Sequence, residues 1–181
     1  MKKNFDINLR PICFEDAEVL MALNNNSEVS NMVVGNANIV TMEQQLHWMS
    51  NLQNEKNIKR WMIDYENKVV GTVFLSSIDN LNCTCNANIK LLPEFHGKGI
   101  AKTALIKVCN IAFNELQLFC ITANVLSFNI SSQMLFKKVG FHEDGILRSR
   151  VIKNGERCDL VTFSLLKTDL LEDEISNERN R

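Results

Sequence analysis

Long apolar stretches are absent from this 181-residue chain, and no run approaches the length needed to cross a bilayer. The first residues, MKKNFDINLRP, are basic but turn polar at once, so they do not predict a targeting segment. We therefore expect a soluble cytoplasmic protein without a membrane partner.

An excess of charge of one sign is also missing. The chain has 20 Lys and Arg residues against 21 Asp and Glu residues, which gives a net charge of -1. No overall field attracts nucleic acid, so we expect no nucleic-acid partner. Any site for an anion must be built locally.

Metal-binding patterns are lacking as well. The six cysteines are scattered through apolar segments without a C-x-x-C pair, and there are only three histidines. Cys83 and Cys85 in NCTCN would supply two zinc ligands where a structural site needs four. We expect no metal, and we interpret the cysteines as buried free thiols in a reducing compartment.

The pattern that remains is that of one α/β domain. Alternating and helical periodicities predict the order β-α-α-β-β-β-α-β-α-β-β, in a mixed sheet. We expect one domain over 1–168 and a charged tail over 169–181. The expected strands are 5–12, 58–65, 69–78, 83–92 and 119–126, with a hairpin over 140–166, and the expected helices are 14–26, 41–54, 100–116 and 129–139.

Three local signals sharpen this outline. The Asn24–Asn26 triplet should end the first helix. Thr41 and Gln44 have the spacing of a capping box at the start of the second helix, whose apolar face should be formed by Leu46, Met49 and Leu52. Asn154-Gly155 predicts a type I′ turn in the last hairpin.

The glycine-containing stretch HGKGIAKT, His96 to Thr103, follows an expected strand and begins a helix. It suggests the nucleotide-binding pattern G-x-x-x-x-G-K-[ST], but the register is wrong. Counting back from Lys102-Thr103, Ala101 and His96 occupy the two positions where glycine is required. The dinucleotide pattern G-x-G-x-x-G fails too, since Lys102 stands at its third glycine.

Closely spaced glycines at a helix start can still hold an anion. They let backbone N–H groups point outward, and the helix dipole adds about 0.3–1 kcal/mol of attraction. Lys98 and Lys102 flank these amides and could neutralise further charge. Alternatively, Gly97 and Gly99 merely form a tight turn, and the loop alone leaves both interpretations open.

The wider context resembles the GNAT acyltransferase superfamily. Its first motif, Q/R-x-x-G-x-G/A, aligns with 96–101, and its second, N-x-x-[AS]-x-x-[LM]-Y-x-K-x-G-F, aligns with 129–141. The resemblance covers most of the chain and implies a mostly antiparallel twisted sheet of about seven strands flanked by about four helices. The residues at the aligned motif positions are His96, Gly97, Gly99, Ala101, Asn129, Ser132, Leu135, Phe136, Lys138, Gly140 and Phe141.

This resemblance implies a site for acetyl-CoA, the co-substrate. Main-chain groups of Ile89, Lys90 and Leu91 would pair with the pantetheine arm, and an amide there would polarise the thioester carbonyl. Asn129 would complete the clamp, or cap the helix that follows it. The loop that would hold the pyrophosphate consists of His96, Gly97, Lys98, Gly99, Ile100, Ala101 and Lys102.

Two residues depart from the family pattern. His96 replaces the usual Gln or Arg, which the backbone binding tolerates. Phe136 replaces the tyrosine that commonly protonates the leaving thiolate, and the one tyrosine, Tyr65, lies on another expected strand. Either water or another donor performs this step, or the chain is a non-catalytic acyl-CoA-binding module.

The attacking amine must lose a proton, and the sequence offers two candidate bases. His47 has a suitable intrinsic pKa, but a histidine on a helix beside Trp48 is also a common surface or packing residue. Asp79 stands at a strand end, where an aspartate also serves to form a turn.

The acceptor is predicted from the amino-terminal half. Residues 23–52 resemble GNAT enzymes of the pseudaminic-acid pathway type, which acetylate a nucleotide-linked amino sugar, and ALNNN resembles spermidine acetyltransferases. A polycation needs clustered carboxylates, and 29–42 contains none. We therefore expect a small-molecule amine acceptor, first an amino sugar, with polyamines and ribosomal-protein amino termini as alternatives, and a possible homodimer.

Overall fold

The computed structural model describes residues 6–35 and 39–169. One seven-stranded sheet has the order β1-β2-β3-β4-β5-β7-β6. Its strands are β1 (Ile7–Arg10), β2 (Lys59–Tyr65), β3 (Lys68–Asp79), β4 (Thr84–Leu91), β5 (Cys120–Leu126), β6 (His142–Lys153) and β7 (Glu156–Leu166).

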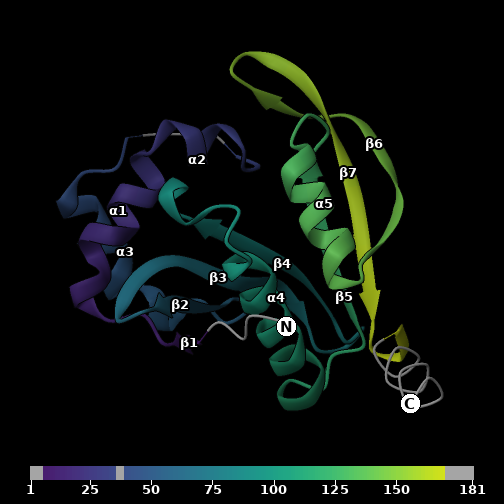
Figure 1. Cartoon of the computed structure of the whole chain (residues 1–181), viewed down its shortest axis with the longest axis horizontal. Helices are drawn as coiled ribbons and strands as arrows, with labels where there is room; N and C mark the ends of the chain where they lie inside the picture. Colours follow the sequence, from purple (N-terminus) through teal and green to yellow (C-terminus); the bar gives the residue numbers. More distant parts are fainter. Residues whose placement is uncertain (1–5, 36–38, 170–181) are drawn as a thin grey trace.

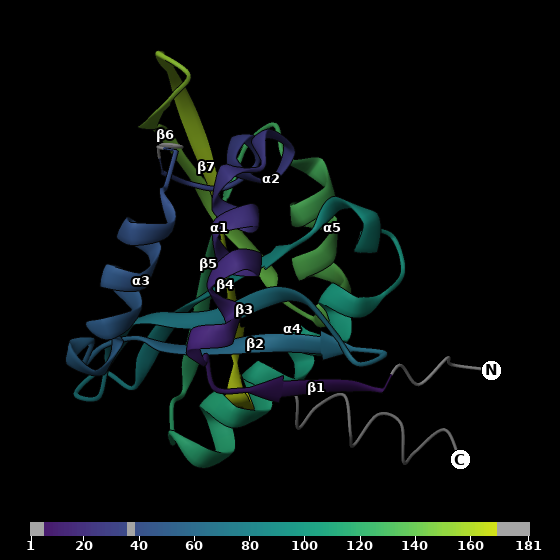
Figure 2. The same cartoon turned by 90° about the vertical axis from the view of Figure 1, so that its left-hand side faces the viewer.

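The helices lie on both faces of the sheet (Figures 1 and 2). α1 and α3 cover one face of β1–β4, α4 covers the other, and α5 lies beside β5 and β7. The α-helices are α1 (Ala17–Asn25), α2 (Ser27–Asn31), α3 (Met42–Ser50), α4 (Ile100–Asn110) and α5 (Ile130–Val139). Single turns are η1 (Phe14–Asp16), η2 (Leu52–Asn54) and η3 (Pro93–Phe95), and the π-helical η4 (Ile111–Glu115) extends α4.

The pairing of β4 with β5 divides the sheet. Every other neighbouring pair is antiparallel, whereas β4 and β5 are parallel and pair only from Thr84–Cys120 to Asn86–Thr122. Beyond Asn86 the two strands diverge, so the sheet opens as a V whose arms are β4 and β5 (Figure 1). This architecture confirms the predicted mixed, mostly antiparallel sheet of seven strands.

Two apolar clusters hold the layers together. The larger one packs α4 and α5 against the sheet, with Leu105, Phe113 and Phe163 fully buried. The smaller one packs α1 and α3 against β2, through residues that include Leu20 and Met62. Each such side chain contributes about 1.5–3 kcal/mol when it is removed from water, so both helical layers are firmly seated.

Several local predictions are confirmed. Thr41 and Gln44 form the capping box of α3, and Thr41 Oγ1 accepts the Gln44 N–H at 3.3 Å. Asn154 and Gly155 have φ angles of 51° and 85°, as a type I′ turn requires.

The asparagine triplet ends α1 as predicted, since α1 stops at Asn25. Asn26 then caps α2, a short helix that was not predicted, by accepting the Val29 N–H at 3.1 Å. The predicted apolar face of α3 was wrong at Leu46. On α3 the buried residues are Gln45 and Met49, while Leu46 is exposed. A polar side chain thus occupies a core position that the hydrophobic pattern gave to leucine.

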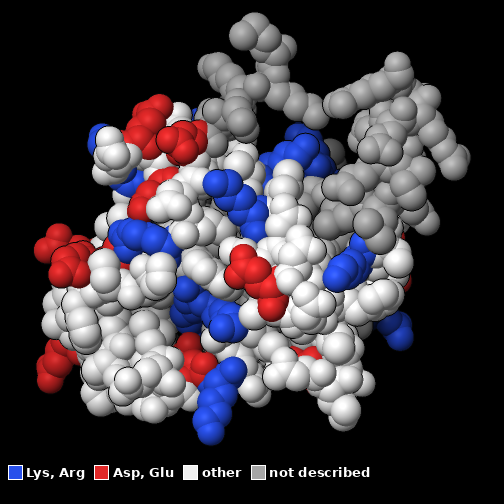
Figure 3. Space-filling model, turned by 90° about the horizontal axis from the view of Figure 1, so that it is seen from below, with Lys and Arg blue, Asp and Glu red and all other residues white. Residues whose placement is uncertain are grey.

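Charges of both signs are interspersed on the face shown in Figure 3. Most of the predicted tail, 170–181, lies outside the described residues. Within the described part of the chain, no helix is long and apolar enough to cross a membrane, and no cluster of three potential metal ligands occurs.

Candidate active site

The glycine loop lies at the N-terminus of α4, beside the open end of β4. Gly97 and Gly99 both have left-handed φ angles, 73° and 86°, and Gly99 is the N-cap of α4. A glycine has no side chain to cap the first helical amides, which also lack intrahelical partners. The N–H groups of Ile100, Ala101 and Lys102 are therefore available to an anion.

Side chains fix this loop from both sides. The His96 imidazole Nε2 lies 3.0 Å from the Leu91 carbonyl oxygen, which ties the loop to the last residue of β4. The Lys98 ammonium lies over the Phe95 ring at 5.0 Å. His96 thus has a structural role of its own where the family usually has Gln or Arg.

The neighbouring stretch of β4 has one free edge. Ile89, Lys90 and Leu91 pair with β3, and their other edge faces the opening, because the pairing with β5 has already ended. Opposite them, Gly71 permits an unusually close approach, since a Cβ there would lie 2.2 Å from the Lys90 carbonyl oxygen. This edge can accept an added extended strand.

Asn129 joins two elements across the opening. Its Oδ1 accepts the Ser132 N–H at 3.0 Å and so caps α5, and its Nδ2 donates to the Met32 carbonyl oxygen at 2.8 Å. The capping alternative for Asn129 is confirmed. A role in a coenzyme clamp stays a prediction.

Phe136 lies in an aromatic cluster and is only 3% exposed. Its ring meets Phe141 edge-on at 5.0 Å and stacks on Phe163 at 6.3 Å. These contacts explain why a phenyl ring is stable here, since a buried hydroxyl would need a hydrogen-bond partner. Its place beside a departing sulfur stays a prediction.

The two candidate bases come from different elements, α3 and the end of β3. His47 is exposed on α3, beside residues that line a pocket but not among them. Asp79 lies where β3 turns toward β4, at the opposite end of β4 from the glycine loop. Asp79 pairs with Thr84 on β4, five residues before Ile89. At about 3.3 Å per residue, Thr84 and Ile89 are about 17 Å apart along the strand.

The Asp79 carboxylate is held within its own turn. It accepts the N–H groups of Leu81 and Asn82 at 2.9 and 3.0 Å and the Asn82 side-chain amide at 2.7 Å. The Asn82 side chain and these amides lower the pKa of Asp79, because they stabilise the carboxylate. The turn-forming interpretation accounts for every one of these contacts, and the catalytic roles of Asp79 and His47 remain predictions.

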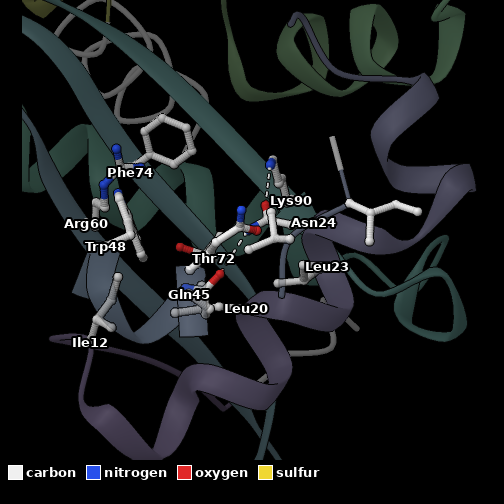
Figure 4. Close-up of a pocket in the computed structure, with 13 residues that line it drawn as sticks. Ile12, Leu20, Leu23, Asn24, Gln45, Trp48, Arg60, Thr72, Phe74 and Lys90 are labelled. Atoms are coloured by element: carbon white, nitrogen blue, oxygen red, sulfur yellow. Dashed lines mark hydrogen bonds between the residues drawn. The ribbon is translucent and has the colours of Figure 1, made fainter. Parts of the chain in front are cut away.

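A pocket of about 550 Å³ lies between α1, α3 and the face of β2–β4 that these two helices cover. Figure 4 shows its side chains converging from these elements. It is adjacent to the open edge, because the Lys90 side chain enters the pocket while the Lys90 backbone borders the opening. The lining residues are Ile12, Leu20, Leu23, Asn24, Ile39, Val40, Gln44, Gln45, Trp48, Arg60, Thr72, Phe74 and Lys90.

The charged groups of this pocket are both cations. Arg60 is fixed between the rings of Trp48 and Phe74, 5.3 and 4.5 Å from their centroids, and its Nε donates to Glu55 at 2.9 Å. Lys90 donates to Asn24 Oδ1 at 3.0 Å. Burial lowers the pKa of Lys90, and the positive charge of Arg60 lowers it further.

A buried lysine anchors the chain segment that follows α2. Lys153, at the tip of the β6–β7 hairpin, is 4% exposed. Its ammonium donates to the carbonyl oxygens of Ser30, Val33 and Gly35 at 2.6, 3.0 and 2.7 Å. Burial lowers the pKa of Lys153, and the three carbonyl oxygens oppose that shift because they stabilise the ammonium. The hairpin is thereby locked onto the segment leading to the pocket.

The chain belongs to the GNAT acetyltransferase family. The family model described as "Acetyltransferase (GNAT) domain" matches residues 6–142, which agrees with the fold and with the loop geometry. The chain is accordingly an N-acetyltransferase that uses acetyl-CoA, an assignment that favours an enzyme over a non-catalytic binding module.

Its relatives are bacterial N-acetyltransferases. An uncharacterised N-acetyltransferase, YoaA of Bacillus subtilis, is 29% identical over 164 residues, covering 88% of this chain and 92% of that protein. The putative ribosomal N-acetyltransferase YdaF of the same organism is 32% identical over 105 residues, 58% of this chain and 57% of that one. A spermidine N-acetyltransferase from Vibrio cholerae, solved with CoA and spermine, superposes with a TM-score of 0.85 at 22% identity, covering 91% and 98% of the two chains.

Most residues of the pocket were not predicted from the sequence. Arg60 and Lys90 are charged residues inside otherwise apolar strand segments, and that contrast was a usable signal. Gln45 was not predicted to be buried, because the hydrophobic pattern assigned the buried position to the neighbouring Leu46. Nothing near Lys153 in the sequence marks it as buried.

Proposed function

We propose that this protein transfers the acetyl group of acetyl-CoA to the primary amine of a nucleotide-linked amino sugar. The observation that supports this acceptor most is the pocket, which contains Arg60 and Lys90 and no carboxylate among the residues that line it. A polyamine carries several positive charges and would be repelled there. A nucleotide-linked sugar brings negative charge with its amine.

The coenzyme would occupy the opening between β4 and β5. Its pyrophosphate would accept hydrogen bonds from the glycine-loop amides, with Lys98 and Lys102 adding opposite charge. A lysine in the first helical turn is unfavourable by itself, so a bound anion would offset its cost. The pantetheine arm would pair with the free edge of Ile89–Leu91 as an added strand, leading the thioester toward the pocket.

The reaction would proceed by direct attack. The neutral amine nitrogen bonds to the thioester carbonyl carbon, the carbon–sulfur bond breaks, and CoA leaves as a thiolate. A backbone N–H of β4 would stabilise the developing negative charge on the carbonyl oxygen. The amine proton would pass to a base or to water, and the thiolate would be protonated by water or a group other than Phe136, which has no proton to donate.

The alternatives come from the relatives. Spermidine N(1)-acetyltransferase of Vibrio cholerae is 25% identical over 170 residues, and YdaF is named as a putative ribosomal enzyme. Polyamines and protein amino termini are therefore the competing acceptors. A homodimer remains a prediction, and one structural neighbour, also from Vibrio cholerae, is described as dodecameric.

An acceptor panel tests the proposal. The protein is incubated with acetyl-CoA and a nucleotide-linked amino sugar, spermidine or an amino-terminal peptide, and free thiol is measured against a control without acceptor, because the chain has six cysteines of its own. We expect the highest kcat/KM with the amino-sugar nucleotide. A preference for spermidine would refute the proposed acceptor, and no thiol release with any amine would refute the activity.

A further inference from the structure

Side-chain hydrogen-bond donors converge in the pocket between α1 and α3. Figure 4 shows Lys90, Arg60 and Gln45 around the same space. They come from β4, β2 and α3, so the tertiary fold rather than local sequence brings them together. Arg60 has an anionic partner outside the pocket, Glu55, but no carboxylate is among the residues that line the pocket.

Gln45 supplies an observation that is independent of charge. Its side chain is 1% exposed, and its Nε2 is buried without a hydrogen-bond partner. The Oε1 of the same amide accepts the Asn24 Nδ2 at 3.3 Å, which fixes the amide plane. A buried donor without a partner costs stability and is rare in folded proteins. A bound acceptor oxygen would satisfy it.

The two cations are arranged to receive the same group. Asn24 occupies one donor of the Lys90 ammonium, which has three. The bond that Arg60 makes to Glu55 uses Nε, and the two aromatic rings hold its guanidinium plane in place, so the terminal nitrogens keep a fixed direction. Glu55 binds the Nε of Arg60 but does not line the pocket, and no carboxylate is among the lining residues, so the space between Lys90 and the terminal nitrogens of Arg60 attracts an anion.

We propose that this pocket is an anion subsite for the acceptor, in which Lys90 and Arg60 bind a phosphate or carboxylate group and Gln45 Nε2 donates a neutral hydrogen bond. The inference rests on the proposed function, because only an acetyltransferase has an acceptor. Anion binding at the subsite itself does not depend on the coenzyme. Because Lys90 also borders the free edge of β4, an anion held there lies about one lysine side chain away from the expected thioester. The subsite thus selects amines whose own molecule carries negative charge and rejects polycations.

Anion binding to the CoA-saturated protein tests this subsite directly. Saturating CoA first occupies the glycine loop, so that a second anion can report only on another site. The probes are inorganic pyrophosphate and UDP for phosphate chemistry, and succinate for carboxylate chemistry, each titrated by calorimetry. We expect one chemistry to bind and to weaken with added salt. If none of the three probes binds, the subsite is refuted.

Three variants separate recognition from folding. Lys90→Met and Arg60→Met keep an apolar stem and should weaken anion binding by about 10- to 100-fold, as expected for a lost charge-assisted hydrogen bond. Gln45→Met removes the unpartnered donor, so anion affinity should fall by about tenfold while the melting temperature is unchanged or raised. Lys68→Met, which changes an exposed lysine at the first residue of β3, is the matched control and should bind as the wild type does.

Failure of the subsite and failure of the proposed function look different. If CoA binds and amines are acetylated, but all variants keep wild-type anion affinity, the enzyme stands and the subsite is wrong. If CoA does not bind while pyrophosphate binds in a Lys90-dependent manner, the subsite stands and the proposed function is wrong. A lower kcat in Lys90→Met with unchanged KM and anion affinity would make Lys90 a proton acceptor instead, which also overturns the inference.

Discussion

Replacing Lys153 by methionine should loosen the segment that follows α2. Methionine keeps most of the apolar stem but removes the three donors that hold the carbonyl oxygens of Ser30, Val33 and Gly35. Ser30 is 8% exposed, so its carbonyl would lose its partner in a place that water reaches poorly. Val33 is half-buried and Gly35 is exposed, so water can replace the lysine there.

The magnitude follows from these differences. An unsatisfied buried carbonyl costs about 1–3 kcal/mol, and the two accessible carbonyls cost little. Removing the ammonium also removes the cost of burying its charge, which offsets part of the loss. We therefore expect the free energy of unfolding to fall by about 2 kcal/mol, which lowers the melting temperature by about 4–8 °C in a protein of this size.

The assay compares thermal unfolding and steady-state kinetics of Lys153→Met with those of Lys56→Met, an exposed lysine in the turn before β2. The acceptor KM should rise in Lys153→Met because the segment that precedes the lining residue Ile39 in the chain is no longer anchored, while the affinity for acetyl-CoA stays unchanged. A melting temperature equal to that of Lys56→Met would refute the reasoning, since the three hydrogen bonds would then contribute nothing.

The remaining predictions concern the opening and the chemistry. Gly99→Val should abolish acetyl-CoA binding by blocking the loop amides. Gly155→Val is the control: its φ is 85° against 86° for Gly99, so it imposes similar backbone strain in the β6–β7 turn and should leave binding intact. Equal losses of binding in both variants would mean that backbone strain alone is responsible. If His47 deprotonates the amine, His47→Ala lowers kcat at neutral pH by about 10²-fold and recovers as the pH approaches the pKa of the amine, and an unchanged kcat removes it from the mechanism. Asp79→Ala should lower the melting temperature and leave kcat close to that of the wild type, because its carboxylate is committed to its turn; a large loss of kcat with an intact fold would contradict this. Phe136→Tyr should keep or raise kcat, by up to about 10²-fold or more if no other group protonates the thiolate, with little change in acetyl-CoA affinity; a loss of activity in a folded variant would show that the ring does not lie beside the sulfur.

Local signals predicted the elements well and their interior poorly. The Asn154-Gly155 turn and the Thr41 capping box follow from the conformational needs of a few adjacent residues, so the sequence alone was sufficient. The short helix α2 was not predicted, for a physical reason: an asparagine that ends one helix can also cap the next, and a helix as short as α2 has too few residues to show a period.

The candidate site also has a part that the sequence predicted and a part that it did not. The glycine loop and the β4 edge are contiguous in sequence, so a resemblance could indicate both. The pocket instead depends on Lys90, Arg60 and Gln45, which come from three different elements. The anchoring of the segment after α2 depends on Lys153 reaching residues more than a hundred positions away. No short-range sequence pattern predicts such long-range contacts, because they follow from the twist and packing of the sheet.

The central claim is that the opening between β4 and β5 binds acetyl-CoA through the glycine loop, and direct titration of the coenzyme tests it most simply. Acetyl-CoA at a hundredfold excess over its Kd should stabilise the fold by about 2.7 kcal/mol, and ATP at the same concentration should do far less. Stabilisation by ATP without any by acetyl-CoA would contradict the account.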